Sequence, residues 1–499
     1  MASSDTSVVI LAAGKGTRMR SELAKVLHRA GGRPLIEHVV RAAQAIKPAQ
    51  VLAIVGHQAE AVSAAVEGLG AQTILQNPQR GTGHAMQIAR RAIRKSAKIA
   101  IVVPGDAPLL RAETLAALLD THRRGEAAAT VLTAEIANPF GYGRIVRDSE
   151  GRVQAIVEEK AATPEQREIR EVNSSIYCFT LAKLWPCLSA LRPDNAHHEL
   201  YLTDAIALLR RQNERVLALV APDANEILGC NTRAHLADID RVFRSRKALE
   251  LMEAGVTIYL PETVLIDPEV TAGADSLIEP GVQLLGKTRI GARCQIGAGC
   301  ILSDVRVGDG AILAPQSHLV GCRVGPDTRI GPFSRLRPGT DVREGAHVGS
   351  FVEIKNTVLH EGAKAPHLSY LGDASIGAQT NVGAGTITCN YDGVAKHETK
   401  IGKNVFIGSD SALVAPVRIG DGAYVAAGSI ITENVPADGL AIARGRQVNK
   451  PGWARARRLA QQREAKTKSK ARSKRSTRGS GSRKPRPRRP VRRKAARRR

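Results

Sequence analysis

Aliphatic residues recur every six positions from residue 278 to 431, and most are followed by a small residue and one or two glycines. A period of six fits neither an α-helix nor an alternating strand. Each six-residue unit must therefore be one short strand plus a corner, with its aliphatic side chain turned into a prism that is stable only when turns stack. The inward positions are Ile278, Leu284, Ile290, Ile296 and Leu302, then Val307, Leu313 and Leu319, then Val324, Ile330, Leu336, Val342, Val348 and Ile354, and finally Ile401, Ile407, Leu413, Ile419, Val425 and Ile431.

Two stretches interrupt this six-residue count, at 355–373 and 386–400. Loops can vary while the scaffold beneath them stays fixed, so functional side chains concentrate in them. The first stretch contains His367 and Tyr370, and the second contains Asn390 and Tyr391. We therefore expect the chemistry of this half in the two interruptions.

The first half of the chain alternates short apolar runs with helical patterns, which predicts an α/β domain built on a largely parallel sheet. Ligands on such sheets collect at the carboxyl ends of the strands. A longer helical pattern over 232–253, closed by Gly255, is expected to join this domain to the coil. We expect strands over 8–12, 51–55, 99–103, 128–133, 172–179 and 216–220, and helices over 35–46, 84–94, 114–123 and 202–212.

The net charge of +26 is concentrated at the carboxyl end. Residues 454–499 hold 22 Lys and Arg and one acid, Glu464, so this tail carries +21 and the rest of the chain only +5. With almost no apolar residues the tail is expected to be disordered. It also lacks aromatic residues that stack on bases, so we expect no specific nucleic-acid binding, only nonspecific contact with polyanions.

The seven cysteines include no CxxC pair, which favours free thiols in a reducing cytoplasm over disulfides or a zinc site. No apolar run is long enough for membrane insertion. The residue patterns thus divide the chain into 1–231, a linker helix 232–255, a coil 256–453 and the tail 454–499.

A glycine-rich loop, Leu11-Ala-Ala-Gly-Lys-Gly-Thr-Arg18, follows the first predicted strand. Gly14 and Gly16 allow the backbone to approach a phosphate, and Lys15 and Arg18 supply positive charge. A dinucleotide fold is disfavoured because the third glycine of GxGxxG is missing. A second strand end carries Asp106, which on its own is most often a helix cap or turn residue.

With Lys25 in Leu23-Ala-Lys-Val-Leu27, this loop closely resembles that of the sugar-1-phosphate nucleotidyltransferases. The resemblance implies a Rossmann-like fold in which UTP, an amino sugar and Mg²⁺ meet. One departure is Asn173-Ser174-Ser175, where the family often has Asn-Thr-Gly. The implied ligands are Leu11, Ala12, Ala13, Gly14, Arg18 and Lys25 for the nucleoside triphosphate, Gln76, Gly81 and Thr82 for uracil, Gly143, Glu158 and Asn173 for the sugar, and Asp106 with Asn231 for Mg²⁺.

The six-residue repeats resemble those of the hexapeptide acyltransferases, which implies a left-handed parallel β-helix. The sequence around His367 closely resembles the acetyltransferase half of the bifunctional bacterial family that makes UDP-N-acetylglucosamine. That family forms homotrimers with the acyl site between subunits. The resemblance implies His367 as general base, Arg337 and Lys355 for the sugar phosphate, Tyr370 and Asn381 for the amino sugar, and Ala384, Asn390, Tyr391, Ser409, Ala427 and Arg444 for acetyl-CoA.

The chemistry requires a base such as His367, because an amine is protonated at neutral pH and cannot attack a thioester until it loses a proton. A loop histidine is by default a structural residue, so the resemblance decides this assignment. We expect Glu353 to orient the imidazole or to stabilise its charge.

The sequence therefore predicts a bifunctional enzyme in which the coil acetylates glucosamine 1-phosphate and the first domain joins the product to UTP, for peptidoglycan and lipopolysaccharide precursors. Two other interpretations stay open. One is a nucleotidyltransferase for another sugar phosphate, with the coil as scaffold only; His367, Arg337 and Lys355 argue against it. The other is a polyanion-binding scaffold, which deletion of 454–499 would separate from an enzyme.

Overall fold

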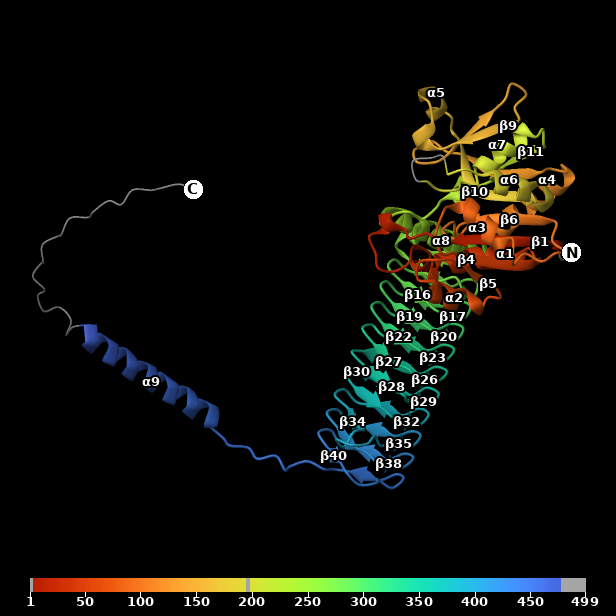
Figure 1. Ribbon diagram of the computed structural model, residues 1–499. Coiled ribbons are helices and arrows are strands. Elements are labelled where there is room, and N and C mark those ends of the chain that lie inside the picture. Colours follow the sequence, from red (N-terminus) through yellow and green to blue (C-terminus); the bar gives the residue numbers. More distant parts are fainter. Residues whose placement is uncertain (1–2, 194–197, 477–499) are drawn as a thin grey trace, which may run out of the picture. The chain divides into compact units, whose positions relative to one another are not determined.

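The first domain of the computed structural model (Figure 1) is built on one mixed sheet, and the structure describes residues 3–193 and 198–476. The strand order is β11-β7-β10-β6-β1-β4-β5, and the hairpin β8-β9 pairs with β10. Strands β4, β5 and β6 continue the parallel pattern of β1, whereas β10 runs antiparallel to both β6 and β7. The strands are β1 Ser3–Ala12, β4 Pro48–Val55, β5 Gln72–Leu75, β6 Ile99–Pro104, β7 Ala129–Glu135, β8 Arg144–Arg147, β9 Val153–Val157, β10 Glu171–Thr180 and β11 Val216–Val220.

Helices cover both faces of this sheet, because alternate residues of a strand point to opposite sides. On β1, Val8 and Ile10 enter one hydrophobic core, shared with α1, α2 and α4, and Val9 enters the other, shared with α3, α6 and α7. All six predicted strands and all four predicted helices are present. The helices are α1 Leu35–Ala45, α2 Ala59–Glu67, α3 Thr82–Ala89, α4 Ala112–Arg124, α5 Pro164–Arg167, α6 Leu181–Ala190 and α7 Asp204–Arg211.

The predicted joining helix is α8, Arg233–Glu253. The Thr232 side chain caps it by accepting a hydrogen bond from the His235 amide (3.1 Å), and Gly255 follows its end with φ of 92°. Its residues Ala248 and Leu251 belong to the core of the coil, while Ile239 packs with Met19 and Leu35 of the first domain. The helix therefore contacts both halves of the chain.

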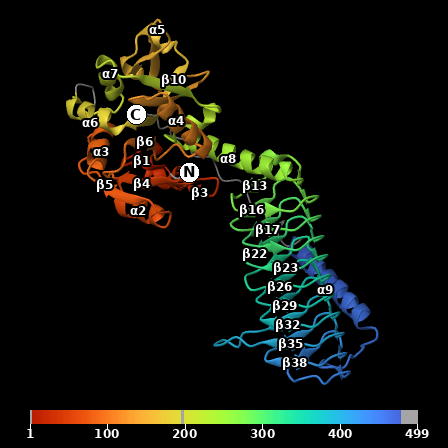
Figure 2. The same ribbon diagram turned by 90° about the vertical axis from the view of Figure 1, so that its right-hand side faces the viewer.

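The coil has three faces, which are parallel sheets of 11, 10 and nine strands (Figure 2). One turn takes 18 residues where Ile278 pairs with Ile296, and 17 where a corner is shorter, as between Leu302 and Leu319. Every inward residue predicted from the six-residue count is at most 6% exposed. The coil is the predicted left-handed parallel β-helix.

The first face contains β12 Thr257–Ile258, β15 Leu277–Ile278, β18 Gln295–Ile296, β21 Ile312–Leu313, β24 Arg329–Ile330, β27 His347–Ser350, β30 Lys364–His367, β33 Asn381–Val382, β36 Phe406–Ile407, β39 Tyr424–Val425 and β41 Leu440–Ala441. The second contains β13 Leu265–Ile266, β16 Gln283–Leu285, β19 Ile301–Ser303, β22 His318–Val320, β25 Arg335–Leu336, β28 Glu353–Lys355, β31 Tyr370–Gly372, β34 Ile387–Cys389, β37 Ala412–Val414 and β40 Ile430–Ile431. The third contains β14 Thr271–Ala272, β17 Arg289–Ile290, β20 Arg306–Val307, β23 Arg323–Val324, β26 Asp341–Val342, β29 Val358–Leu359, β32 Ala374–Ile376, β35 Thr399–Ile401 and β38 Val417–Ile419.

Of the two predicted interruptions, only the second is a loop. Residues 355–373 stay inside the coil as β29, β30 and β31, so the expectation of a loop there is wrong. Ala365 takes the inward position, fully buried, and the flanking steps to Leu359 and Leu371 keep the stacking. Because alanine is small, the repeat at Ala365 is not recognised when only large aliphatic residues are counted. The second interruption is a real excursion, because Ile376 pairs with Ile401, 25 residues on.

Residues 444–499 form a unit separate from 1–443. Within it α9 spans Trp453–Ser476, where the sequence predicts disorder. Alanine, arginine, lysine and glutamine all favour helix, which accounts for this difference. Residues 454–471 are all exposed, so this part of the tail buries no core. The rest of the predicted tail, 477–499, lies outside the described residues.

All seven cysteines are free, and six are buried. Among the described residues, no helix has the length and apolar character needed to cross a membrane.

Candidate active sites

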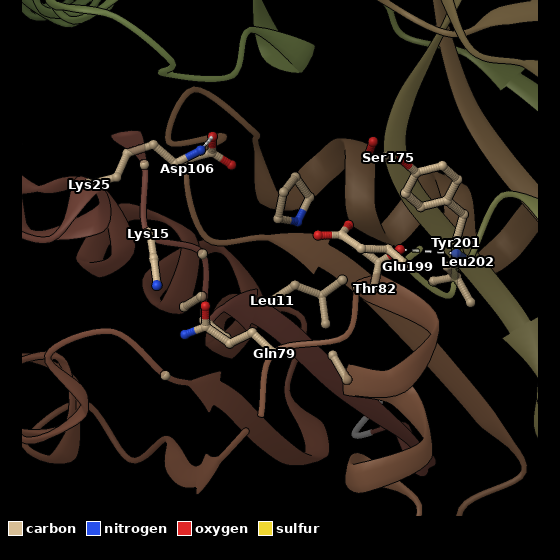
Figure 3. A pocket seen from close by; sticks show the side chains of 18 of the residues that line it. Leu11, Lys15, Lys25, Gln79, Thr82, Asp106, Ser175, Glu199, Tyr201 and Leu202 are labelled. Carbon is tan, nitrogen blue, oxygen red and sulfur yellow. Dashed lines mark hydrogen bonds and ion pairs between the residues drawn. The ribbon is translucent and has the colours of Figure 1, made fainter. Parts of the chain in front are cut away.

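The first candidate site is a cavity of about 1880 Å³ at the carboxyl ends of β1 and β6. Figure 3 shows Lys25 reaching Asp106 in this cavity, with Thr82 and Leu202 at another part of the wall. The cavity brings together eleven residues predicted from sequence, which come from five separate stretches of the chain. They are Leu11, Ala12, Ala13, Gly14, Arg18, Lys25, Gln76, Gly81, Thr82, Asp106 and Glu158.

Positive and negative groups meet at the centre of this cavity. The Lys25 ammonium forms an ion pair with Asp106 and lies 3.4 Å from the side-chain oxygen of Asn231. Arg18 donates to the same Asn231 oxygen (2.9 Å). Asp106 follows β6, and Asn231 precedes α8, so two strand and helix ends supply the oxygens. A carboxylate and an amide oxygen thus converge on one cation.

The glycine-rich loop wraps closely around Lys25. Gly16 has φ of 62°, and a Cβ there would lie 2.6 Å from the Cβ of Lys25. Because an L side chain fits neither the backbone conformation nor the space, glycine is required at this position. Gly14, in contrast, faces open space in which a phosphate can approach its amide.

Gln76 is buried, and its amide nitrogen donates to the Gly81 carbonyl (3.1 Å) while lying 3.2 Å from Nδ1 of His84. The Thr82 hydroxyl accepts a hydrogen bond from the amide of Leu202 (2.9 Å). These contacts fix the orientation of the Gln76 amide, which is the property required of a group that reads a base edge.

Gly143, Glu158 and Asn173 lie together although Gly143 and Asn173 are absent from the cavity lining. The backbone N–H of Asn173 donates to the Gly143 carbonyl (2.8 Å). A Cβ on Gly143 would lie 3.6 Å from a Glu158 carboxylate oxygen. Burial, and then the charge of Asp204, raises the pKa of Glu158. The predicted sugar ligands therefore form one group beside the cavity.

Ser175 stands where the family pattern Asn-Thr-Gly has its glycine, and its backbone has the conformation that glycine favours. Its φ is 62°, in the left-handed region where glycine is favoured, and this position corresponds to the glycine of Asn-Thr-Gly. The preceding Ser174 is buried and donates to the Leu132 carbonyl (2.6 Å). Serine thus keeps the backbone course and adds a hydroxyl to the cavity wall.

Sequence reasoning missed Glu199 and Tyr201, which also line the cavity (Figure 3). Burial, and then the charge of Glu199, raises the pKa of Tyr201. No motif flags either residue, because both precede α7 in a segment without a strand or helix.

The second candidate site lies on the coil, where His367 and three predicted coenzyme residues form one column. Each comes two residues after an inward residue of the first face, so all four occupy the same corner on successive turns. Backbone hydrogen bonds link the turns, with Asp410 donating to the Ala384 carbonyl (2.7 Å) and Gly428 to that of Ser409 (2.8 Å). The column consists of His367, Ala384, Ser409 and Ala427.

The predicted phosphate ligands lie at the other edge of the second face. Arg337 and Lys355 each follow an inward residue, Leu336 and Ile354, on adjacent strands. Lys396, from the excursion, lies beside Lys355, and this neighbour is the main reason why the pKa of Lys355 is lowered. Sequence reasoning missed Lys396; the only available signal was a cation in the one real interruption of the coil.

Tyr370 and Asn390 meet between these edges. A Cβ on Gly372 would lie 2.4 Å from the Tyr370 hydroxyl and 2.9 Å from the Asn390 amide nitrogen, so only glycine fits beneath them. Asn390 also donates to Asp373 (2.5 Å). Asn381 is on the first face, paired with Lys364, just before the corner that carries Ala384.

The excursion is a compact hairpin held by its own contacts. His397 and Asp392 approach to 2.7 Å, and the Asp392 carboxylate accepts from the amides of Val394 (2.8 Å) and Ala395 (2.7 Å). These bonds, with that from Ala395 the largest contributor, lower the pKa of Asp392. Tyr391 is 60% exposed on this hairpin.

Glu353 has a different partner from the one expected. Its carboxylate accepts from Arg337 (3.0 Å) and lies 3.9 Å from Arg335, and it pairs along the sheet with Tyr370. No hydrogen bond or ion pair with His367 is found among the described residues, so the contact that the structure gives Glu353 is with Arg337. Arg444 belongs to the unit 444–499, and its assignment stays a prediction.

Comparison with known proteins finds matches in both the first domain and the coil. Residues 8–172 match the MobA-like NTP transferase domain, residues 287–314 the hexapeptide repeat of succinyl-transferase and residues 398–433 the bacterial transferase hexapeptide. Fold and sites therefore define a nucleotidyltransferase joined to a hexapeptide acyltransferase.

Curated relatives identify the particular family. The chain is 49% identical over 459 residues to the bifunctional protein GlmU of Koribacter versatilis, covering 91% of this chain and 98% of that protein. Identity is 49% to GlmU of Solibacter usitatus (91% and 97% covered) and 48% to that of Pelobacter propionicus (90% and 98%). The chain belongs to the bifunctional GlmU family: it is an enzyme that performs acetyl transfer and uridylyl transfer in UDP-N-acetylglucosamine synthesis.

Proposed function

We propose that the first cavity performs uridylyl transfer from UTP to N-acetylglucosamine 1-phosphate through the groups around Lys25. An oxygen of the sugar phosphate attacks the α-phosphorus, the bond from that phosphorus to the bridging oxygen breaks, and pyrophosphate leaves. Lys25 and Arg18 neutralise charge on the phosphates, and the loops align the two substrates. The convergence of Lys25, Arg18, Asp106 and Asn231 carries this proposal.

We propose that Asp106 and Asn231 also hold Mg²⁺. Their oxygens already face one cation, the Lys25 ammonium, and hard oxygen ligands suit Mg²⁺. A bound Mg²⁺ would supply Lewis-acid charge to the triphosphate. Lys25 must then turn from Asp106 towards a phosphate, and its unbranched side chain permits this.

On the coil, we propose that His367 removes a proton from the amine of glucosamine 1-phosphate. The amine then attacks the acetyl carbonyl of acetyl-CoA, the carbon–sulfur bond breaks, and the thiolate of CoA takes a proton. Arg337 and Lys355 hold the phosphate, Tyr370 and Asn381 hold the sugar, and the small residues of the His367 column leave room for the coenzyme, with Asn390 and Tyr391 beside it.

A substitution pair tests the phosphate assignment. Lys355→Ala is expected to raise the KM for glucosamine 1-phosphate at least tenfold and to leave the KM for acetyl-CoA nearly unchanged. Lys364→Ala, which removes an exposed lysine elsewhere on the coil, is the control. Equal effects of both substitutions on this KM would contradict the assignment.

We further propose that the chain acts as a homotrimer. Phe333, Phe351 and Leu368 form an exposed column next to that of His367, at 52%, 62% and 64% exposure, and Phe333 stacks on Phe351. All three have positive φ, a strained conformation for bulky residues. An exposed apolar column with a strained backbone indicates a contact with another subunit.

Phe351→Asp is expected to weaken the trimer and, with it, acetyl transfer, while uridylyl transfer persists. Light scattering and both half-reaction assays on one preparation check this. A monomer that still acetylates would refute the subunit-interface proposal. We propose a cytoplasmic location, which the free cysteines support.

A further inference from the structure

Helix α9 is strongly basic, and its described side chains are exposed. Its side chains are exposed as far as Ala471, and seven of these exposed residues are Arg or Lys. Because successive helical residues are 100° apart, cations at these spacings surround the helix. They are Arg455, Arg457, Arg458, Arg463, Lys466, Lys468 and Lys470.

The basic tail is not shared in full by every relative of the chain. The relative from Koribacter versatilis aligns over 459 of its residues, 98% of its length, whereas that alignment covers 91% of the present chain. That relative therefore has no room for a counterpart of the whole basic tail. Most of the basic tail is therefore absent from that member of the family.

The charge and the apolar residues of the tail indicate which class of partner α9 can bind. The body of the chain carries +5 and the tail +21, so the two parts have net charges of the same sign and no net attraction. Insertion of a helix into the membrane interface requires an apolar stripe, but the large apolar residues of α9 are only Trp453 and Leu459, both near its start. Only electrostatic contact with anionic headgroups is then left for a bilayer. A phosphate polymer needs no apolar stripe, because it meets cations along its whole length.

We propose that α9 binds nucleic acid through the sugar-phosphate backbone, without regard to base sequence. At 1.5 Å per residue its 24 residues extend about 36 Å, close to one turn of duplex. A duplex carries one charge per about 1.7 Å, so several phosphates lie within reach of each helical turn. Neutralising about six phosphates predicts a slope near −5 in a plot of log K against log salt.

The test is binding of the full chain to two fluorescent 20-base-pair duplexes of unrelated sequence, between 50 and 200 mM salt. Both duplexes should bind equally, and a chain ending at residue 453 should lose binding while keeping both enzyme activities. Replacing Arg457, Arg458, Lys466 and Lys468 with Gln should make the salt slope shallower by about 3.6. Gln461→Ala with Gln462→Ala is the matched control and should change nothing.

Three results would overturn the proposal: undiminished binding by the chain ending at 453, a salt slope unchanged by the four Gln substitutions, or tighter binding to vesicles of anionic phospholipid than to duplex at equal salt. The last result would assign the helix to a membrane surface.

A separate observation concerns Arg246 on α8. Its guanidinium donates to the Leu109 carbonyl (3.1 Å) and to Asp223 (2.9 Å). Leu109 lies in the turn segment 105–109 that also carries Asp106. The Asp106 carbonyl accepts from the amide of Cys230 (2.9 Å), next to Asn231. The turn that presents Asp106 is therefore tied to the joining helix by a charged clamp.

The clamp is reinforced below Leu109. Arg111 lies 3.3 Å from the same Asp223 and 3.7 Å from Glu226, and the Arg111 amide donates to Glu226 (3.1 Å). Glu226 is fully buried. A buried carboxylate that accepts from the backbone holds this segment in one position.

We infer that Arg246 is a positioning residue for the proposed Mg²⁺ site, an inference that rests on that site. Arg246→Met should raise the Mg²⁺ concentration for half-maximal uridylyl transfer about tenfold and leave acetyl transfer unchanged. Arg246→Lys, which keeps one donor, should recover part of the loss. Arg241→Met is the control, because Arg241 is exposed and pairs only with Asp238 of its own helix among the described residues.

A second readout needs no metal: in the ligand-free Arg246→Met protein, backbone amides of residues 105–110 should exchange hydrogen at least fivefold faster than in wild type. Unchanged exchange with unchanged Mg²⁺ dependence would overturn the inference. If wild type showed no uridylyl transfer, the proposed function would be refuted instead.

Discussion

Gly349 provides a sharp test of the His367 assignment, because the chain passes very close to it. A Cβ added at Gly349 would lie 1.9 Å from the Pro366 carbonyl oxygen, whereas ordinary contact begins at 3.4 Å. Pro366 precedes His367 on β30, which is paired with β27 through Val348 and Ser350. Gly349→Ala must therefore move the backbone that carries His367 by about 1.5 Å.

A displacement of this size is large for catalysis, since misplacing a reacting group by 1 Å can cost about 100-fold in rate. We expect Gly349→Ala to lower the kcat of acetyl transfer by about 100-fold, measured by release of the CoA thiol. Uridylyl transfer in the same preparation should stay within about twofold and serves as the folding control.

Strain in the coil alone is controlled with Gly308→Ala, where the added Cβ would lie 2.6 Å from the Pro326 nitrogen, on turns that do not include His367. Gly308→Ala should keep most acetyl transfer. If Gly349→Ala retained kcat within threefold of wild type, the placement of His367 as the base would be refuted.

Three further predictions concern stability, pH and metal. Three arginines, Arg289, Arg306 and Arg323, lie on successive strands of the third face and have no ion-pair partner among the described residues. Arg306→Glu should remove their mutual repulsion and raise the melting temperature by roughly one or two degrees at low salt, and by less at 1 M salt. A melting temperature below that of wild type would contradict this account. Burial, and after it the charge of Asp204, raises the pKa of Glu158. Asp204→Asn should therefore lower that pKa and shift the acid limb of the uridylyl-transfer pH profile to lower pH; no shift would show that Glu158 does not control this limb. Chelation with EDTA should abolish uridylyl transfer and spare acetyl transfer. Loss of both activities would contradict a metal requirement confined to the first cavity.

The coil could be predicted closely because its period is a direct consequence of packing. Ile278, Leu284 and their successors are inward because large aliphatic side chains fill the interior of a narrow prism. The same reasoning failed at Ala365, where a small residue continues the stack without a visible signal. Residue types alone do not report which turn has space for alanine.

The first site was accessible from sequence where it depends on short motifs, as at Gly16 and Lys25. The contacts of Glu353 and Lys396 could not be predicted from the sequence, because they depend on which corners of the coil align. Glu199 and Tyr201 reach the cavity from an irregular segment whose course is fixed by tertiary contacts only. The helix α9 shows that local propensity can form a helix where hydrophobic patterning predicts none.

The central claim is that one chain holds two chemically independent sites that act in sequence. The most direct measurement follows acetylated intermediate and UDP-sugar together from glucosamine 1-phosphate, acetyl-CoA and UTP, in wild type, His367→Ala and Asp106→Ala. We expect wild type to form UDP-N-acetylglucosamine, Asp106→Ala to stop at N-acetylglucosamine 1-phosphate, and His367→Ala to form product only when that intermediate is supplied. Loss of both half-reactions in either variant, or full activity of Asp106→Ala, would contradict it.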